Sequence, residues 1–155
     1  MITLEPMTDA EYQRFLEPAI AEYAQDHVQA GQWTAEEAMG QSRKEFLALL
    51  PDGVKTPDHY LFTLVNETRQ NVGMLWFAMR GHGEAFVYDV RVDDAFRRRG
   101  YASQAFLELE NKARNLGATR ISLHVFGKNH GAIEMYNKLG YEPTNILMAK
   151  ALETT

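Results

Sequence analysis

The stretch VRVDDAFRRRGYA, residues 90–102, decides the fold of this chain. It starts with apolar residues typical of a strand, continues through a charged loop, and ends in small residues where a helix begins. Beyond it, apolar side chains recur every three or four positions up to Gly117, which indicates an amphipathic helix. Residues 84–92, 100–116 and 120–126 therefore predict a strand, a helix and a second strand parallel to the first.

The flanking segments extend this pattern on both sides. Residues 60–65 and 72–79 are rich in aromatic and apolar types, and short polar turns separate them from each other and from the strand at 84–92. Such short turns favour antiparallel neighbours. Downstream, Asn129 can cap another helix, and residues 141–152 predict one or two short strands.

The first third of the chain is predicted to be mostly helical. Thr8-x-x-Glu11 and Thr34-x-x-Glu37 are capping boxes, in which each side chain bonds the other residue's backbone N–H at a helix start. Pro18 lies inside the first helical pattern and is expected to kink or split that helix. Together the elements predict an α/β fold, with a mixed central sheet flanked by helices.

Composition and charge exclude several classes of protein. The chain has 155 residues and is 45% hydrophobic, enough for a single domain over residues 1–155 with a substantial core. Its net charge of −5 argues against a nucleic-acid partner, although Arg97, Arg98 and Arg99 form one local basic run. No apolar stretch approaches the ~18–20 residues that a membrane span needs, so we expect no membrane partner.

The residue types also restrict the chemistry. There is no cysteine, which excludes a disulfide scaffold, a thiol nucleophile and a cysteine zinc site. His27, His59, His82 and His130 lack the spacing of metal ligands, so we expect no metal site. The first residues, MITLEPMTDAEY, lack the basic and apolar regions of a signal peptide, so we expect a cytoplasmic protein.

The loop and helix start at residues 97–103 form the first candidate binding site. A helix N-terminus presents four backbone N–H groups without intrahelical partners and a partial positive charge. Gly100 and Ala102 leave room for a ligand to approach that backbone, and arginine adds charge-assisted hydrogen bonds to phosphate. The segment is therefore either a pyrophosphate cradle or a solvated basic loop that caps a helix.

Two motifs in this order resemble the GCN5-related N-acetyltransferases, the GNAT family. The family motif Gln/Arg-x-x-Gly-x-Gly/Ala corresponds to RRRGYA at 97–102, and the signature N-x-x-A-x-x-x-Y-x-x-x-G-F/Y corresponds to NHGAIEMYNKLGY at 129–141. The resemblance is closest over residues 60–150. It implies a sheet whose parallel fourth and fifth strands splay apart, a helical acceptor-site region over 1–57, and an acetyl-CoA-binding core over 58–152.

The resemblance also implies which residues bind acetyl-CoA, the expected co-substrate. In this family the backbone of the fourth strand pairs with the pantetheine arm, and a bulge frees an N–H that polarises the thioester carbonyl. Backbone donors at the next helix start hold the pyrophosphate. The corresponding residues are Val90, Arg91 and Val92 for pantetheine, Arg97, Arg98, Arg99, Gly100, Tyr101, Ala102 and Ser103 for pyrophosphate, and Asn129 and Ala132 at the second helix start. Asn129 is equally well explained as an ordinary helix cap.

Tyr136 matches the family tyrosine that protonates the departing CoA thiolate. With unperturbed pKa values of ~8.5 for a thiol and ~10 for a phenol, that proton transfer is uphill by roughly 2 kcal/mol. Tyr136 is therefore expected to stabilise the thiolate by hydrogen bonding as much as by proton donation. The alternative is that it is a core aromatic on the inner face of its helix.

His124 and Asp89 are the candidates for the remaining catalytic roles. An alkylammonium is about one part in 10³ neutral at pH 7, so the acceptor must lose a proton before attack. His124 lies on the strand predicted at 120–126, where some family members have a glutamate base, and a histidine of pKa ~6.5 can serve. Asp89, on the neighbouring strand, is expected to orient His124 or attract a cationic acceptor. A water relay, or ordinary structural roles for both residues, are the alternatives.

The resemblance implies an enzyme that moves the acetyl group of acetyl-CoA to a primary amine by direct attack in a ternary complex. The acceptor would be a small molecule or a peptide, and the acidic balance favours a cationic one. Tyr23 and Trp33 are candidates for the acceptor pocket, against ordinary helix packing. Dimers are common in the family, so a homodimer is compatible with the resemblance. The alternative function is a non-catalytic acyl-CoA-binding or regulatory module.

Overall fold

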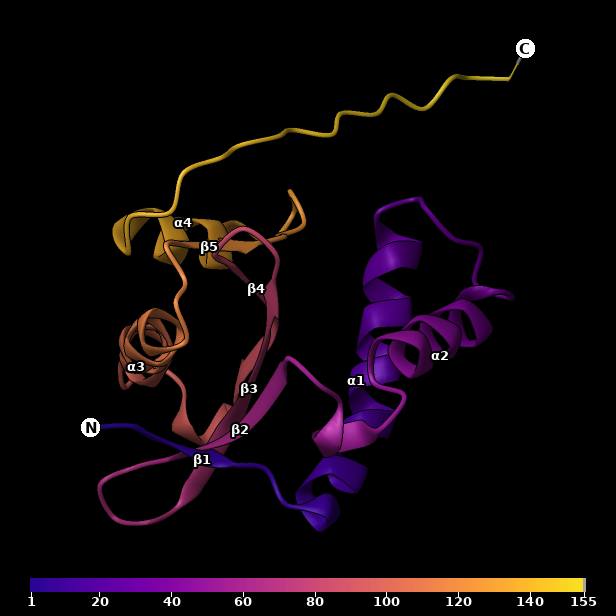
Figure 1. Ribbon diagram of the computed structural model, residues 1–155. Helices are drawn as coiled ribbons and strands as arrows, with labels where there is room; N and C mark the ends of the chain where they lie inside the picture. The colour runs from indigo at the N-terminus through magenta and orange to yellow at the C-terminus, as the bar shows by residue number, and fades with distance from the viewer. Residues whose placement is uncertain (155) are drawn as a thin grey trace.

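The computed structural model describes residues 1–154 and contains a five-stranded sheet between two layers of helices (Figure 1). The first four strands pair antiparallel, whereas β4 and β5 are parallel. The predicted mixed sheet is therefore confirmed. In spatial order, the strands are β1 (Thr3–Pro6), β2 (His59–Val65), β3 (Asn71–Arg80), β4 (Glu84–Val92) and β5 (Arg120–Leu123).

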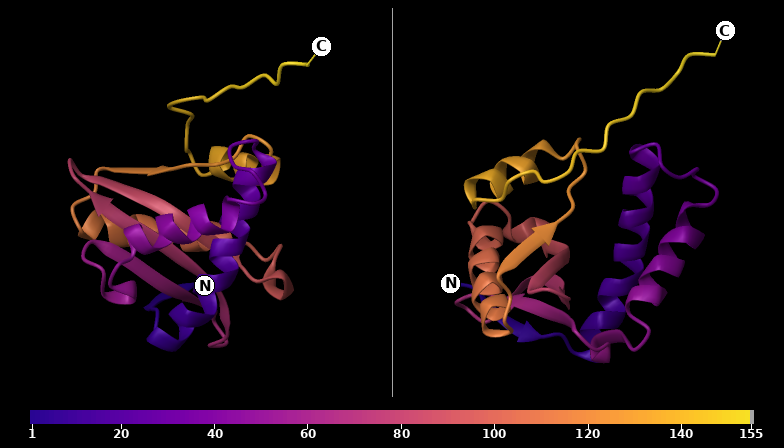
Figure 2. Two further views of the ribbon diagram at one scale, coloured as in Figure 1. Left: turned by 90° about the vertical axis from the view of Figure 1, so that its right-hand side faces the viewer. Right: turned by 45° about the horizontal axis from the view of Figure 1, so that its top comes forward.

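The helices cover both faces of this sheet. Helices α1 and α2 lie together on one face, and α3 and α4 pack on the other (Figures 1 and 2). In the described part of the chain, no helix is both long and apolar enough to cross a bilayer. The helices are α1 (Asp9–Gln29), α2 (Ala38–Leu49), α3 (Tyr101–Asn115) and α4 (His130–Lys138), with short 3₁₀ turns at Gly53–Lys55 and Asp94–Phe96.

In helix α1, one local sequence signal predicts the structure correctly and another does not. The capping box forms as predicted, with Thr8 and Glu11 exchanging hydrogen bonds of 2.9 and 3.1 Å. The expected split at Pro18 is wrong, because α1 is one helix from Asp9 to Gln29. Ala19 and Ile20, which follow the proline, are fully buried. Their packing on the sheet outweighs the roughly 3 kcal/mol that an interior proline costs a helix.

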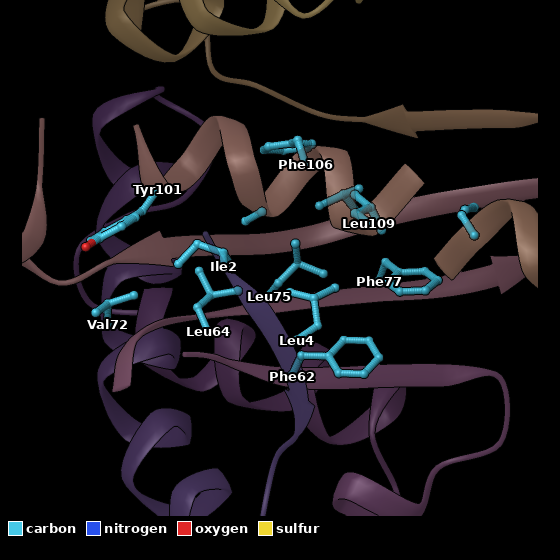
Figure 3. Packing of buried hydrophobic residues seen from close by; sticks show 14 residues of the cluster. Ile2, Leu4, Phe62, Leu64, Val72, Leu75, Phe77, Tyr101, Phe106 and Leu109 are labelled. Atoms are coloured by element: carbon cyan, nitrogen blue, oxygen red, sulfur yellow. The ribbon is translucent and has the colours of Figure 1, made fainter. Parts of the chain in front are cut away.

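The sheet separates two hydrophobic cores. Between the sheet and α3, the core includes Phe77 and Phe106, both fully buried, and Figure 3 shows these side chains together with those of β1 and β2. Between the sheet and α1 and α2, the core contains Trp76 and Phe46. Trp76 and Phe77 are neighbours in the chain and pack in opposite cores, as the alternation of a strand requires.

Two predictions of strands in the C-terminal part of the chain are wrong. β5 ends at Leu123, so His124 lies in the loop that follows and not on the strand predicted at 120–126. The reason is that β4–β5 pairing stops at the Val87–Leu123 pair, and a strand without a partner cannot continue its ladder. The expected strands at 141–152 are also absent from the described residues. The C-terminal tail, residues 142–154, is exposed and runs away from the body (Figure 1).

Candidate active site

A bulge divides β4 at the centre of the candidate site. Trp76 lies opposite Asp89, whereas its neighbour Phe77 lies opposite Val87, so Tyr88 is one extra residue on β4. Tyr88 stacks on Trp76 with ring centroids 4.6 Å apart, in the core under α1 and α2. In a regular strand Asp89 would point to the same face of the sheet as Val87, toward α3. Because of the extra residue, Asp89 points to the opposite face, toward α1.

Beyond the bulge, β4 has a partner on one side only. The parallel pairing with β5 ends at the Val87–Leu123 pair, while the antiparallel pairing with β3 continues to Val92. The segment Asp89–Val92, here called the open half of β4, therefore presents an unpaired backbone edge toward the α4 side. The free N–H and C=O groups of a strand edge can form hydrogen bonds with the backbone-like groups of an extended ligand, so this edge can pair with one. The predicted pantetheine residues Val90, Arg91 and Val92 all lie in this half.

The start of α3 lies at residues 100–103, where the sequence predicts an anion cradle. Gly100 is the N-cap residue with φ +76°, and no side chain caps the helix, so its first N–H groups stay free for a ligand. A Cβ at Gly100 would meet only the amide of Gln104, at 3.9 Å, which leaves the approach open. Arg97 is held by its own loop, since Nε donates to the Val92 carbonyl at 3.2 Å and Nη2 pairs with Asp94 at 3.0 Å.

The other residues of the predicted pyrophosphate site differ in their surroundings. The Tyr101 side chain is buried in the α3-side core, where its hydroxyl donates to Glu67 at 3.3 Å, so it offers only its backbone to a ligand (Figure 3). Arg98 and Arg99 are exposed. Ser103 opens into a pocket of about 330 Å³ between α3 and α4, which Gly131, Glu134, Met135, Lys138 and Leu139 also line.

Asn129 and Ala132 lie at the start of α4, beside that pocket. The Asn129 side chain accepts a hydrogen bond from the Ala132 N–H at 3.2 Å, which makes it the N-cap of α4. The capping role that the sequence allowed for Asn129 is thus observed. Ala132 directly follows Gly131, which lines the pocket.

Tyr136 projects from α4 into an aromatic cluster at the edge of the α3-side core. Its ring meets those of Phe106 and Tyr141 edge-on, with centroids 5.4 and 5.8 Å apart. Burial raises the pKa of Tyr136, and the negative charge of Asp89 raises it further. Tyr136 therefore keeps its proton at neutral pH. Its packing in the core, which the sequence offered as the alternative, is observed.

Asp89 belongs to a charged network that reaches α1. Its carboxylate accepts from Arg91 Nε at 3.0 Å, and Arg91 also pairs with Glu22. Burial raises the pKa of Asp89 despite the attraction of Arg91. Burial lowers the pKa of Arg91, but Asp89 and Glu22 outweigh it, so that pKa is raised overall and Arg91 stays charged.

The expected pairing of Asp89 with His124 is absent, because Asp89 bonds Arg91 and His124 lies beyond the end of β5. The His124 ring instead meets Phe126 edge-on at 4.9 Å. Burial lowers the pKa of His124, and the nearby His27 lowers it further, so His124 is neutral at pH 7. A neutral imidazole can accept a proton.

An aromatic cluster borders the site from the α1 side. Tyr23 and Trp33, the candidates for the acceptor pocket, pack around His27, which stacks on Trp33 with centroids 3.9 Å apart. Phe126 closes the cluster from the loop after β5. Sequence reasoning missed Glu22 and His27, because nothing in the local pattern of α1 marks either residue. Within residues 1–154, no group of three His, Asp or Glu side chains converges as metal ligands would.

Known proteins resemble this chain in sequence and in fold. Residues 19–141 match the acetyltransferase (GNAT) family. The chain is 36% identical to the uncharacterized N-acetyltransferase YdgE of Bacillus subtilis, with coverage of 97% of this chain and 98% of YdgE. It is 38% identical to the uncharacterized N-acetyltransferase YycN of the same organism, with coverage of 97% and 99%.

The crystal structure of YycN, a putative acetyltransferase, superposes with a TM-score of 0.94 at 37% identity, covering 99% of this chain and 100% of that one. The family match spans most of the chain, including both motifs and the open half of β4. These findings confirm the resemblance seen in the sequence. The chain therefore belongs to the GNAT family of acetyltransferases.

Proposed function

We propose that this protein transfers the acetyl group of acetyl-CoA to a primary amine of a small molecule or peptide, by direct attack in a ternary complex. The open half of β4 carries the proposal. It supplies an unpaired backbone edge, and the chain leads from it through one short loop to the uncapped start of α3. An extended pantetheine arm and a pyrophosphate need these two features in this order.

Each part of the acetyl-CoA molecule has residues suited to it. Pantetheine amides pair with the backbone of Val90–Val92, and a backbone N–H at the bulge polarises the thioester carbonyl. The pyrophosphate takes the free N–H groups of Gly100–Ser103, with Arg98 and Arg99 supplying positive charge. In this proposal residues 58–152 bind acetyl-CoA, and the helical region 1–57 shapes the acceptor side.

The chemistry divides between two side chains. His124, whose pKa is lowered by desolvation, removes a proton from the acceptor ammonium. The free amine then forms the C–N bond while the C–S bond breaks, and the thiolate leaves with its electron pair. Tyr136 stabilises that thiolate by hydrogen bonding and donates its phenol proton to it, and the second proton, which the newly acetylated nitrogen releases, restores the phenol through solvent. Because burial raises the pKa of Tyr136, full proton transfer is more uphill than with unperturbed groups, and the hydrogen bond carries more of the effect.

Carboxylates favour a cationic acceptor. Asp89 and Glu22 flank Arg91, and Asp26 lies one turn further along α1. Burial raises the pKa of Asp26, and the charge of Glu22 adds to that shift. Arg91 neutralises one of these carboxylates, and the net negative charge that remains on the α1 side raises the local concentration of amines in their ammonium form.

A thiol-release assay tests the proposal. Acetyl-CoA is offered with polyamines, amino acids, aminoglycosides and short peptides, and the absence of cysteine from the chain removes any protein thiol background. We expect acceptor-dependent release of CoA with at least one class. Binding of acetyl-CoA without release by any acceptor would favour the non-catalytic module, and absence of binding would contradict the site itself.

A further inference from the structure

The loop after β5 carries the proposed base without support from the sheet. β5 ends at Leu123 and α4 begins at His130, so His124 lies where no strand ladder fixes the backbone. A general base must lie within hydrogen-bond reach of the proton that it removes, and a displacement of about 1 Å can cost a factor of about 100 in rate. Other contacts must therefore hold this loop in place.

Two contacts tie the loop to the C-terminal end of α1. The ring of Phe126 meets the ring of His27 edge-on, with centroids 5.3 Å apart and an angle of 89° between the planes. Two residues further along, the ammonium group of Lys128 donates to the carbonyl oxygen of Gln29, the last residue of α1, at 3.0 Å. His27 is itself held by Trp33, on which it stacks with centroids 3.9 Å apart. The position of the loop therefore depends on the His27 ring.

The His27 ring also has hydrogen-bonding groups that its packing does not use. Both ring nitrogens are buried, and among residues 1–154 neither has a hydrogen-bond partner. Buried polar groups in folded proteins are nearly always paired, because an unpaired one is costly. A phenylalanine would make the same ring contacts without that cost. The two nitrogens therefore indicate a role besides packing.

His124 is the neighbour on which these nitrogens can act. Its ring meets the same Phe126 edge-on, with centroids 4.9 Å apart. Burial lowers the pKa of His124, and the charge of His27 lowers it further. On α1, Tyr23 meets the His27 ring with centroids 4.5 Å apart, and the carboxylate of Asp26 attracts the charge of His27. The other charged groups around this cluster act on other partners, namely Lys128 on Gln29, Glu45 on Tyr23, and Glu22 and Arg91 on Asp26.

We propose that His27 positions His124 for acetyl transfer: its ring ties the loop that carries the base to α1, and its nitrogens compete with the base for a proton. Two neighbouring imidazoles repel each other when both are protonated, so a proton on one opposes a proton on the other. Asp26 favours the proton on His27, which leaves His124 free to receive one from the acceptor ammonium. The inference rests on the proposed function, in which His124 is the base. His27 acts through His124, so it is a positioning residue.

An NMR titration of the His124 ring tests the pairing without any turnover. The signal is identified by its loss in His124→Gln. The variant His27→Phe keeps an aromatic ring against Trp33 and Phe126 but removes both nitrogens. We expect the measured pKa of His124 to rise by about 0.5 or more in this variant, because the opposing charge is gone. An unchanged pKa would overturn the proposal.

His82→Asn is the matched control for the loss of a histidine. His82 lies in the turn between β3 and β4 with φ +65°, a conformation that asparagine tolerates, and it belongs to neither contact of the loop. The pKa of His124 in His82→Asn should equal that of the parent. An equal rise in His82→Asn and in His27→Phe would also overturn the proposal, because the effect would not be specific to His27.

Steady-state kinetics tests what the pair does for catalysis, with the acceptor that the thiol-release assay identifies. Well below the pKa of His124, a rise of 0.5 leaves about threefold less of the neutral base, so kcat/KM of His27→Phe should be about threefold below the parent in acid and equal to it at pH 8. His27→Ala removes the ring as well, so kcat should fall about 10-fold or more at pH 8 with the KM for acetyl-CoA unchanged.

The outcomes separate this inference from the proposed function. If His27→Ala kept the kcat of the parent at pH 8, the ring would not hold the loop and the proposal would be overturned. If the pKa of His124 rose in His27→Phe while neither protein showed an acid limb in kcat/KM, the pairing of the two histidines would be supported and the role of His124 as the base would be contradicted.

Discussion

The two halves of β4 differ in what surrounds their backbone. Glu84–Val87 lies between β3 and β5, and Ala85 and Val87 belong to the α3-side core. The open half, Asp89–Val92, pairs with β3 alone and is only half-buried. One extra residue, Tyr88, separates the two. A single insertion thus changes a structural strand into a surface that can bind an extended ligand, because it reverses the side chains and removes one backbone partner.

This difference has a measurable consequence. Truncating a side chain in the paired half should change the free energy of unfolding, whereas truncating one in the open half should mainly change kinetic constants. A substitution that displaces the backbone of the open half should change both. The variants below test that division, from the largest expected effect to the smallest. The kinetic readouts use the acceptor that the thiol-release assay identifies.

Gly73→Ala tests the backbone contact that supports the open half. A Cβ at Gly73 would lie 1.9 Å from the carbonyl oxygen of Arg91, so β4 must shift. We expect unfolding to become easier by about 3 kcal/mol, by analogy with overpacked cores, and the KM for acetyl-CoA to rise. Gly40→Ala is the control, because nothing lies within 4 Å of that Cβ and alanine favours the α2 helix. Equal stability of the two variants in urea would refute the contact.

Tyr136→Phe tests the role of the phenol at the open half. We expect kcat to fall about 100-fold, or roughly 2.7 kcal/mol in barrier, because the thiolate loses its hydrogen bond. The melting temperature should change little, since the ring still packs on Phe106. Tyr141→Phe is the matched control in the same aromatic cluster, and its kcat should be that of the parent. Unchanged turnover in Tyr136→Phe would remove Tyr136 from the chemistry.

Val87→Ala and Val90→Ala compare the two halves directly. Val87 is 5% exposed in the paired half, so its truncation should lower the free energy of unfolding by about 2 kcal/mol. Val90 is only half-buried, and its truncation should cost less than about 1 kcal/mol while raising the KM for acetyl-CoA. Chemical denaturation and steady-state kinetics measure the two effects. If Val90→Ala proved the more destabilising, the division of β4 would be wrong.

His124→Gln tests the proposed base through pH. The pKa of His124 is lowered below 6.5 by burial, so the active neutral form persists at neutral pH and is lost only as the pH falls below that value. The profile of kcat/KM should therefore decline on the acid side below pH 6.5. In His124→Gln that decline should disappear, with activity reduced about 10-fold or more at pH 7.5. An unchanged acid limb in the variant would point to a water relay.

Much of the fold is predictable because its signals are local. The helix at α3 follows from apolar residues every three or four positions, and the start of α1 from the capping box at Thr8. The parallel pairing of β4 and β5 follows from the helix between them. The motifs at 97–102 and 129–141 identified the family before any coordinates were considered, since they are contiguous in the chain.

The details of the site depend on residues far apart in the chain. Nothing near Arg91 predicts its ion pair with Glu22, 69 positions away, and the partner of Asp89 is Arg91. The end of β5 was also unpredictable, because it is set by where β4 diverges at Tyr88 and not by the residues of β5. Pro18 stays inside the helix for a similar reason. The packing of Ala19 and Ile20 stabilises α1 by more than the proline destabilises it.

The amino-acid sequence by itself therefore determined the order of the elements from β2 to α4, the family, and the segment that we propose to bind acetyl-CoA. Periodicity, caps and motifs act over a few neighbouring residues, and each can be recognised without a partner. Only the tertiary structure decided which backbone edges stay open, which charges meet and where the tail goes. Those outcomes depend on pairing across the sheet, where a shift of one residue moves a side chain to the other face.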